Sequence, residues 1–175
     1  QSIIVQYLSF MLNAAQGDLG TSIFFNQPVT QVLADRAEPT AFLALFSLIF
    51  AVVIATPIGL YAAYRRGSFL DQTSITLAML AASLPSFWTG LLMQRYFATD
   101  LGWFPASGYG GPDAGFLERM QHLLLPSLVL GIVNSALILR FTRASMLDVL
   151  GEDYVRTARS KGMSEMRVVL RHALK

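Results

Sequence analysis

The sequence has few side chains suited to acid–base, nucleophilic or metal chemistry, and they lie far apart. It contains two histidines, His122 and His172, and no cysteine. An intramembrane hydrolase needs a Ser/His pair or two aspartates at membrane depth, and a metal centre needs clustered ligands. The longest apolar segments contain no Asp or Glu, and no acid is placed to orient His122. We therefore expect no enzyme active site and no bound metal or cofactor.

The polar residues with informative spacing lie near the C-terminus. Arg156, Arg159 and Lys161 precede Gly162, and glycine is the residue type that most often ends a helix in the left-handed conformation. Basic side chains in this arrangement can bind acids on a protein partner or anionic lipid head groups. We expect a helix, a tight glycine turn and a second helix over residues 144–175.

The second of these expected helices is amphipathic. Ser164 stands at its N-cap position, with Glu165 in the first turn. One face is apolar, with residues at i, i+3, i+4, i+7 and i+8, namely Met166, Val169, Leu170, Ala173 and Leu174. Another face is basic and carries Arg167, Arg171 and Lys175. Such a helix can dock in a groove on a soluble partner or rest on a lipid surface, and the pattern leaves both readings open.

The composition places these residues beside a membrane. The chain has 175 residues, of which 54% are hydrophobic and only 14% charged, with a mean hydropathy of +0.50. A soluble domain usually carries about 25% charged residues. Three apolar segments, at about residues 40–64, 74–97 and 122–140, approach the roughly 20 residues that a spanning helix needs. The sequence therefore predicts an all-α, polytopic transmembrane protein with a core at residues 40–143.

The basic residues predict the orientation. Ten of the 13 Lys and Arg residues follow the first or third segment, and only Arg36, Arg95 and Arg119 lie near the other ends. The positive-inside rule then puts the tail at 144–175 in the cytoplasm. Residues 1–39 and the loop 98–121 are expected outside, the former with an interfacial helix. The basic residues can then contact anionic lipid head groups, which accounts for the net charge of +2. We expect no nucleic-acid partner.

Polar residues within the apolar segments are candidates for a solute pathway. The candidates are Pro85, Ser86, Asn134 and Ser135. Buried hydroxyl groups more often hold membrane helices together, at about 0.6 kcal/mol each, whereas for Asn134 both roles stay open. Pro85 lies in the middle of its segment and is the expected point of flexing, since proline breaks the hydrogen-bond ladder of a helix.

The most specific motif of the chain is DYVRTARSKG at residues 153–162, followed by His172-Ala173-Leu174. It resembles the coupling-loop signature of ABC importer permeases in their dipeptide/oligopeptide/nickel branch, and further stretches match that branch in order along nearly the whole chain. Relative to the broader family, Arg156 and Thr157 replace Glu and Ala. Weaker matches are GDLGTS at 17–22, LPSFW at 84–88, GWFP at 102–105, GYGG at 108–111 and HLLLP at 122–126.

The resemblance implies a role and a set of partners. It implies that the loop docks on a cytoplasmic ATPase subunit through Tyr154, Arg156, Thr157, Ala158, Arg159, Lys161 and Gly162. It further implies a second permease subunit, two ATPase subunits, an extracytoplasmic substrate-binding protein and a bacterial inner-membrane location. Spans of the parent protein would lie before residue 1 and after residue 175.

The chain lacks the G-x-x-x-x-G-K-[ST] phosphate-binding pattern, so ATP and Mg²⁺ are expected in the partner subunits. The alternative reading is a non-ATP secondary transporter or channel whose cytoplasmic helix contacts lipid. It would be favoured by a buried charge relay, and the residues show none. The solute is not indicated by the sequence.

Overall fold

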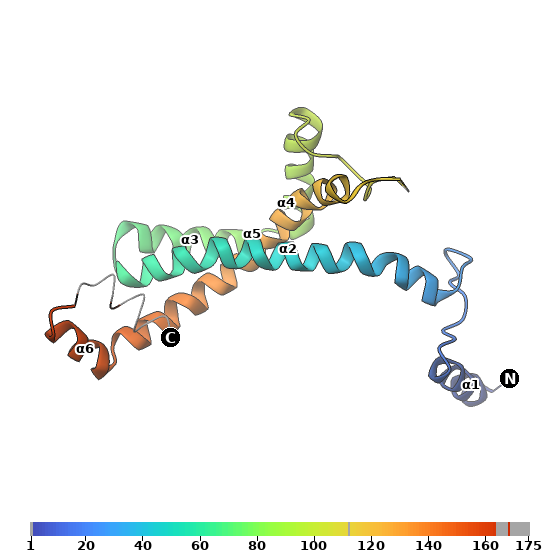
Figure 1. The fold of residues 1–175 in the computed structure, drawn as a ribbon, viewed down its shortest axis with the longest axis horizontal. Coiled ribbons are helices and arrows are strands. Elements are labelled where there is room, and N and C mark those ends of the chain that lie inside the picture. Colours follow the sequence, from blue (N-terminus) through green and yellow to red (C-terminus); the bar gives the residue numbers. More distant parts are fainter. Residues whose placement is uncertain (1, 112, 164–167, 169–175) are drawn as a thin grey trace. The chain divides into compact units, whose positions relative to one another are not determined.

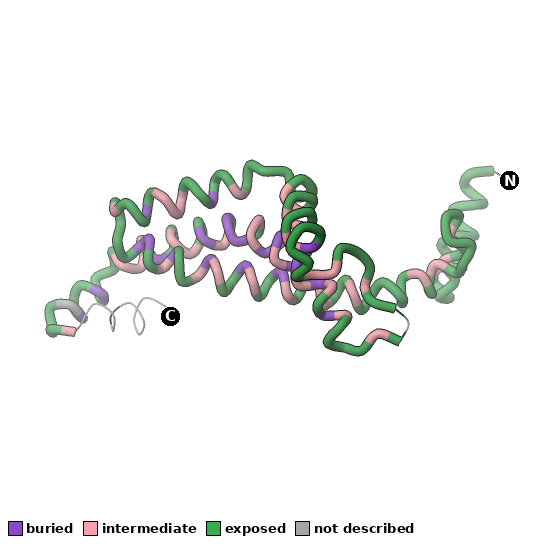
Figure 2. The backbone as a smooth tube through the Cα atoms, turned by 90° about the horizontal axis from the view of Figure 1, so that it is seen from above, coloured by how far each residue is buried: buried purple, intermediate pink, exposed green. Residues whose placement is uncertain are grey.

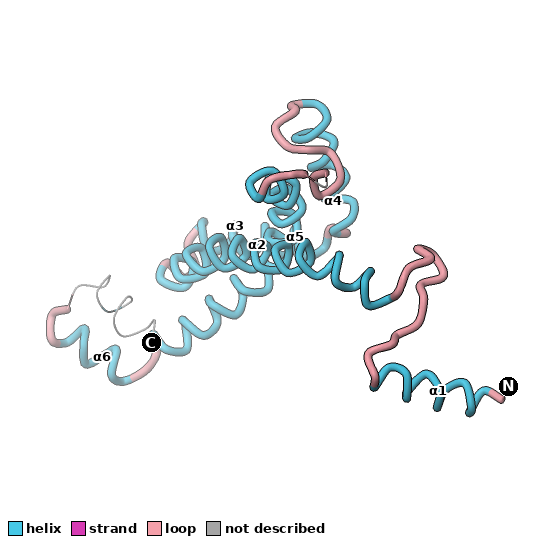
Figure 3. Tube along the Cα trace, turned by 45° about the vertical axis from the view of Figure 1, so that its right-hand side comes forward, coloured by secondary structure: helices cyan, strands magenta, loops and turns pink. Residues whose placement is uncertain are grey.

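The computed structural model describes residues 2–111, 113–163 and 168, and the described part of the chain is helical, with no strand (Figures 1 and 3). An isolated antiparallel bridge pairs Thr21 with Pro28. The all-α fold expected from the sequence is confirmed. The elements are α1 (Ile3–Ala15), α2 (Val29–Tyr64), α3 (Phe69–Ser83), α4 (Ser86–Met93), the π-helical segment η1 (Gln94–Asp100), α5 (Phe116–Leu150) and α6 (Asp153–Ser160).

The chain forms two compact units, Gln1–Phe42 and Leu43–Lys175. In the first unit, α1 is a helix with no buried residue, and it ends before Gly17, which takes a left-handed φ of +88°. A helix in this part of the chain agrees with the expectation for residues 1–39. The Asp18 carboxylate accepts a hydrogen bond from the Gly20 amide at 2.9 Å, which closes the turn that follows.

The core of the second unit is built on a face of small residues along α2. Ser47, Ala51, Ala55, Gly59 and Ala63 recur every fourth position and are all buried. Small side chains let two helix backbones approach closely, which is how many membrane helices associate. A Cβ added at Gly131 of α5 would lie 2.6 Å from the Cβ of Phe50, and one at Gly59 would lie 3.0 Å from the Leu139 carbonyl oxygen. Figure 2 shows buried positions along these helices and exposed ones at their outer faces.

The second expected span is bent. Helix α3 ends at Ser83, and Leu84 is extended with φ −80° and ψ 133°. The segments Phe69–Ser83 and Ser86–Asp100 meet at 97°, and α4 turns away from α2 and α3 in Figures 1 and 3. The apolar segment expected to span at about 74–97 thus consists of two helices joined by a bend. Because a residue before proline is disfavoured in the helical region, Leu84-Pro85 is the physical cause of the break, at the expected flexing point.

The other two apolar segments form longer helices than expected. Helix α2 begins at Val29 instead of residue 40 and continues through Pro39, and α5 covers Phe116–Leu150 instead of 122–140. Both have the length and composition of membrane spans, and the bent pair raises the count to three if it is one span. The turns and coil between residues 101 and 115, apart from residue 112, agree with the loop expected there.

Candidate functional site

Helix α6 begins and ends with identifiable signals. Asp153 lies in its first turn, where a carboxylate is favourable at the positive end of the helix dipole. At the other end, Gly162 adopts φ +77° and the Met163 amide donates to the Ala158 carbonyl oxygen at 3.4 Å. This bond is the long-range bond of a Schellman cap. The glycine turn expected from the sequence is confirmed.

The region before α6 differs from expectation. A helix beginning near residue 144 was expected, yet α5 runs without a break to Leu150. It stops at Gly151, whose amide donates to the Asp148 carbonyl oxygen at 3.0 Å, and Glu152 then leads into α6. The segment that carries α6 is therefore continuous with a long helix of the membrane core. The second helix expected in the tail, from Ser164 to Lys175, lies outside the described residues except for Val168.

The apolar side of α6 packs inside its own loop. Val155 and Val168 are fully buried and form a cluster with Ala158, against which Val149, Leu150 and Met163 pack. Ala158, one of the expected coupling residues, therefore supports the loop from within. Arg159 lies on the same helix.

The other expected coupling residues lie on the exposed side of the loop. They are Tyr154, Arg156, Thr157, Lys161 and Gly162. The Arg156 side chain is 74% exposed, and its Nη1 is 3.6 Å from the Asp153 Oδ1. In so exposed a pair, water competes for both charges, so the attraction adds little to stability. The positive charge of Arg156 thus stays accessible to a partner.

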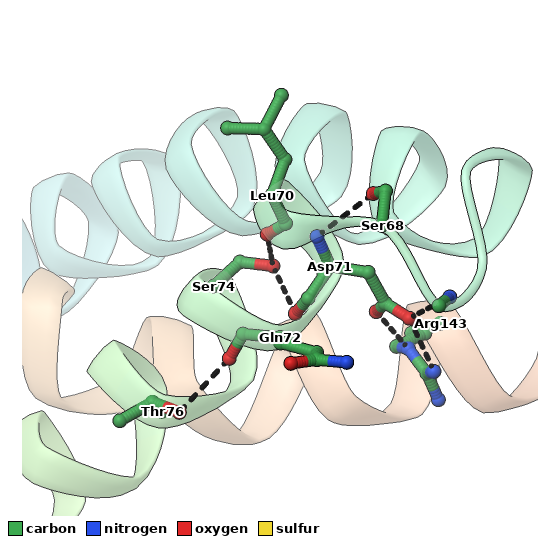
Figure 4. A network of polar contacts seen from close by, with 8 residues as sticks. Ser68, Leu70, Asp71, Gln72, Ser74, Thr76 and Arg143 are labelled. Carbon is green, nitrogen blue, oxygen red and sulfur yellow. Dashed lines mark hydrogen bonds and ion pairs between the residues drawn. The ribbon is translucent and has the colours of Figure 1, made fainter.

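A buried ion pair near this region was missed by sequence reasoning. Arg143 of α5 donates through Nε to Asp71 Oδ1 at 2.7 Å and through Nη2 to Oδ2 at 2.9 Å (Figure 4). Asp71 is 2% exposed. Its Oδ2 also accepts from the Gly67 amide at 2.9 Å, and its own amide donates to Ser68 Oγ at 3.2 Å. Two parallel bonds from a guanidinium fix the direction as well as the distance of a contact.

For this pair, only the Asp71 side carries a recognisable sequence signal. Ser68-x-x-Asp71 marks a helix start, with the serine as N-cap and the acid in the first turn. Arg143 is counted there among the positive-inside charges. Nothing in one sequence relates two residues 72 positions apart. Only the packing of α3 on α5 brings them together.

The four pathway candidates differ in burial. Ser135 is buried, and its hydroxyl donates to the Ile132 carbonyl oxygen of its own helix at 2.7 Å. Asn134, on the same helix, is exposed. Pro85 and Ser86, at the bend between α3 and α4, are also exposed. Ser86 lines a cavity of about 580 Å³ between α4 and α5, together with Phe87, Gly90, Leu91, Gln94, Pro105, Ala106, Ser107, Gly108, His122, Leu125, Pro126, Val129 and Leu130. Gln94 Nε2 donates to the Ala106 carbonyl oxygen there.

Among the described residues, no three His, Asp or Glu side chains come together as a metal site. His122 Nδ1 and Ser127 Oγ are buried without a hydrogen-bond partner in the described part of the chain.

Comparison with known proteins gives a consistent result. A profile described as "binding-protein-dependent transport system inner membrane component" matches residues 55–175. The glutathione transport system permease protein GsiC of Salmonella choleraesuis (strain SC-B67) is 42% identical over all 175 residues. GsiC of Salmonella typhi is also 42% identical, and that of Escherichia coli (strain K12) is 41% identical. The chain spans 55% of the length of each of these relatives.

Proposed function

This chain belongs to the family of binding-protein-dependent transport system inner membrane components, the permeases of ABC importers, and we propose that residues 153–162 couple its membrane helices to a cytoplasmic ATPase subunit. Transport permeases are not enzymes, and the proposal assigns no chemical step to this chain. ATP and Mg²⁺ would be bound by the partner, since this sequence has no phosphate-binding loop.

One observation carries the proposal: the apolar side of α6 is buried in the core of its own loop. A helix that lies on a membrane needs an open apolar face to insert among the lipid chains. The exposed side of α6 instead offers Arg156, Thr157 and Lys161 beside Gly162. A polar, basic surface with a glycine at its edge suits close docking on a partner that carries acidic residues.

The rest of the mechanism is proposed on the same basis. Closure of two ATPase subunits on ATP would move the loop, and α5 would carry the movement into the membrane core. The core would alternate between inward-open and outward-open forms by rocking, as expected of transporters. Asn134 and the residues at the α3–α4 bend would contribute to the pathway, beside a second permease subunit.

The sidedness and solute are further parts of the proposal. The tail at 144–175 would face the cytoplasm, and residues 1–39 and 98–121 would face an extracytoplasmic binding protein. The relatives are named for glutathione transport. We propose a small peptide-like solute of the glutathione kind for the parent protein.

The test is co-purification of the full-length protein with its candidate ATPase subunits, comparing the wild type with Gly162→Arg. A Cβ at Gly162 meets no atom within 4 Å, but the left-handed φ of +77° strains any side chain there, so the control must carry the same strain. Gly17→Arg is the matched control, because Gly17 has a similar left-handed φ of +88° and equally open surroundings.

We expect the wild type and Gly17→Arg to retain the ATPase and Gly162→Arg, still inserted in the membrane, to lose it. If the wild type retains no ATPase, the coupling proposal fails. The tail would then be a lipid-contacting segment.

A further inference from the structure

The coupling loop and the membrane core share two residues. Val149 and Leu150, at the end of α5, pack against the cluster of Val155, Ala158 and Val168. The same two residues also pack against Ala63 of α2 and Met146 of α5. A displacement of the loop would therefore push directly on side chains of the membrane core. Packed protein interiors transmit displacement because they are hard to compress.

The buried ion pair involves a residue of α5 that lies about one helical turn before Met146. Arg143 precedes Met146 by three residues, so it belongs to the same helical segment that the loop contacts. Its guanidinium reaches across to α3 and holds the Asp71 carboxylate at 2.7 and 2.9 Å. Helix α2 thus contacts this segment through apolar side chains, whereas α3 is linked to it here by a directed polar contact.

The far side of Asp71 is also held. Its carboxylate accepts from the Gly67 amide, and Gly67 is in the turn that joins α2 to α3, with φ +78°. Figure 4 shows the carboxylate between this turn and Arg143. Asp71 is thereby fixed to the first turn of α3 and to the turn before it. A force applied to its carboxylate by Arg143 would therefore act on the whole N-terminal end of α3.

A buried ion pair is not an efficient way to increase the stability of a fold. Apolar residues of similar size often stabilise a protein as much, because burying two charges is costly. What the pair adds is geometry: two parallel hydrogen bonds resist both sliding and rotation of one helix against the other. An apolar contact between α3 and α5 would allow small sliding, as packed helices do in shear motions.

We propose that Asp71 and Arg143 are positioning residues that make α3, and with it the Pro85 bend, follow the coupling loop during the ATP cycle. This inference rests on the proposed coupling function. It predicts that α3 and α5 keep a fixed separation while other parts of the permease move.

The experiment measures the α3–α5 distance by spin labels at Thr76→Cys and Ser145→Cys, both exposed positions. Residues 1–175 contain no cysteine, and any cysteine elsewhere in the full-length protein is first replaced by serine. The sample is the full-length protein with its second permease and ATPase subunits in lipid nanodiscs, without nucleotide and with ATP plus vanadate. The test variant is Asp71→Asn/Arg143→Met, which removes both charges and leaves neither one buried alone. Asp100→Asn/Arg95→Met is the control, because that pair is 3.8 Å apart and exposed.

We expect the distance to be the same in both nucleotide states for the wild type and the control. In the test variant it should shift by about 2 Å or more between the states, the size of helix displacements in switching proteins. A purely structural pair would give a broader distance that does not respond to nucleotide. Arg143→Lys, which keeps the charge and loses the paired geometry, should show a smaller shift in the same direction.

The inference is overturned if the wild-type distance changes with nucleotide, or if both variants behave like the wild type. It is also overturned if neither variant assembles with the ATPase subunits, since the pair would then serve folding. Loss of the ATPase from the wild type itself is a different result, which refutes the coupling function.

Discussion

Arg143 and Asp71 are 72 positions apart in the sequence and are joined by two hydrogen bonds of 2.7 and 2.9 Å. The carboxylate is almost fully buried, with 3% of its side chain exposed, and the arginine side chain is 23% exposed. This contact ties the beginning of α3 to the last third of α5. It also makes Asp71 the position where removal of a charge has the most predictable effect on the fold.

Asp71→Asn should lower the free energy of unfolding by about 1–3 kcal/mol, because it removes the counter-ion of an arginine whose side chain is only 23% exposed. The measurement is thermal unfolding of the purified full-length protein in detergent. Asp100→Asn, which breaks an exposed pair with Arg95, should cost less than about 1 kcal/mol. Equal unfolding midpoints for the two variants would show that the buried pair does not stabilise the fold.

Gly131→Ala should destabilise the contact between α2 and α5 by about 1–3 kcal/mol, the usual cost of overpacking. Its Cβ would come within 2.6 Å of the Phe50 Cβ, so one of the helices must shift. Gly90→Ala is the matched control, since its nearest neighbour is a Val129 methyl group at 4.0 Å. The control should be neutral or slightly stabilising, because alanine favours a helix over glycine. Both can be compared by detergent-resistance of the folded protein on heating.

Pro85→Ala should allow part of the population to straighten across the α3–α4 bend. Spin labels at Gln72 and Tyr96 would be about 36 Å apart on a straight helix with a rise of 1.5 Å per residue. With the 97° bend, the same spacing gives roughly 24 Å. We expect a second, longer distance in Pro85→Ala. Pro126→Ala should leave the distance unchanged, because Pro126 lies within the unbroken α5. A single short distance in both would assign the bend to packing against α5.

Val155→Asp should open the loop around α6. Val155 is fully buried, and an unpaired charge at that position cannot stay inside without a large cost. Trypsin should then cleave after Arg156 and Lys161 at least about tenfold faster, since a factor of ten needs only about 1.4 kcal/mol. Thr157→Ala, on the exposed side of the same helix, should be cleaved at the wild-type rate. Equal cleavage of both would mean that the cluster around Val155 does not hold the loop closed.

Much of the fold follows from local sequence. Apolar length predicts α2 and α5, and glycine chemistry predicts the turn at Gly162. The start of α2 and both ends of α5 differ from the prediction because polar residues continue the helices beyond their apolar parts. Glu38 and Pro39 lie inside α2, and Asp148 lies inside α5. Helix length is set by backbone hydrogen bonding, whereas the apolar segment marks only a membrane-compatible part of it.

The candidate site was predicted in part. The residue pattern marks α6 and Gly162, and it favours a basic surface there. It does not say which side of α6 is buried, because the burial depends on Val149, Leu150 and Val168 from elsewhere in the chain. The Asp71–Arg143 contact depends in turn on how closely α3 and α5 approach each other in the fold. Those are distances in space, which residue spacing along one chain does not encode.

The small core around Val155 has a thermodynamic consequence for whatever binds the exposed side of α6. Binding a disordered segment costs the free energy of ordering it, about 0.5–1.5 kcal/mol for each long side chain that becomes fixed, in addition to the backbone. Here the backbone of α6 is already held by its own apolar cluster before any encounter. Association would proceed near the rate of a rigid surface, and affinity would be adjusted through dissociation. A partner can bind and release a loop of this kind repeatedly without the loop folding and unfolding each time.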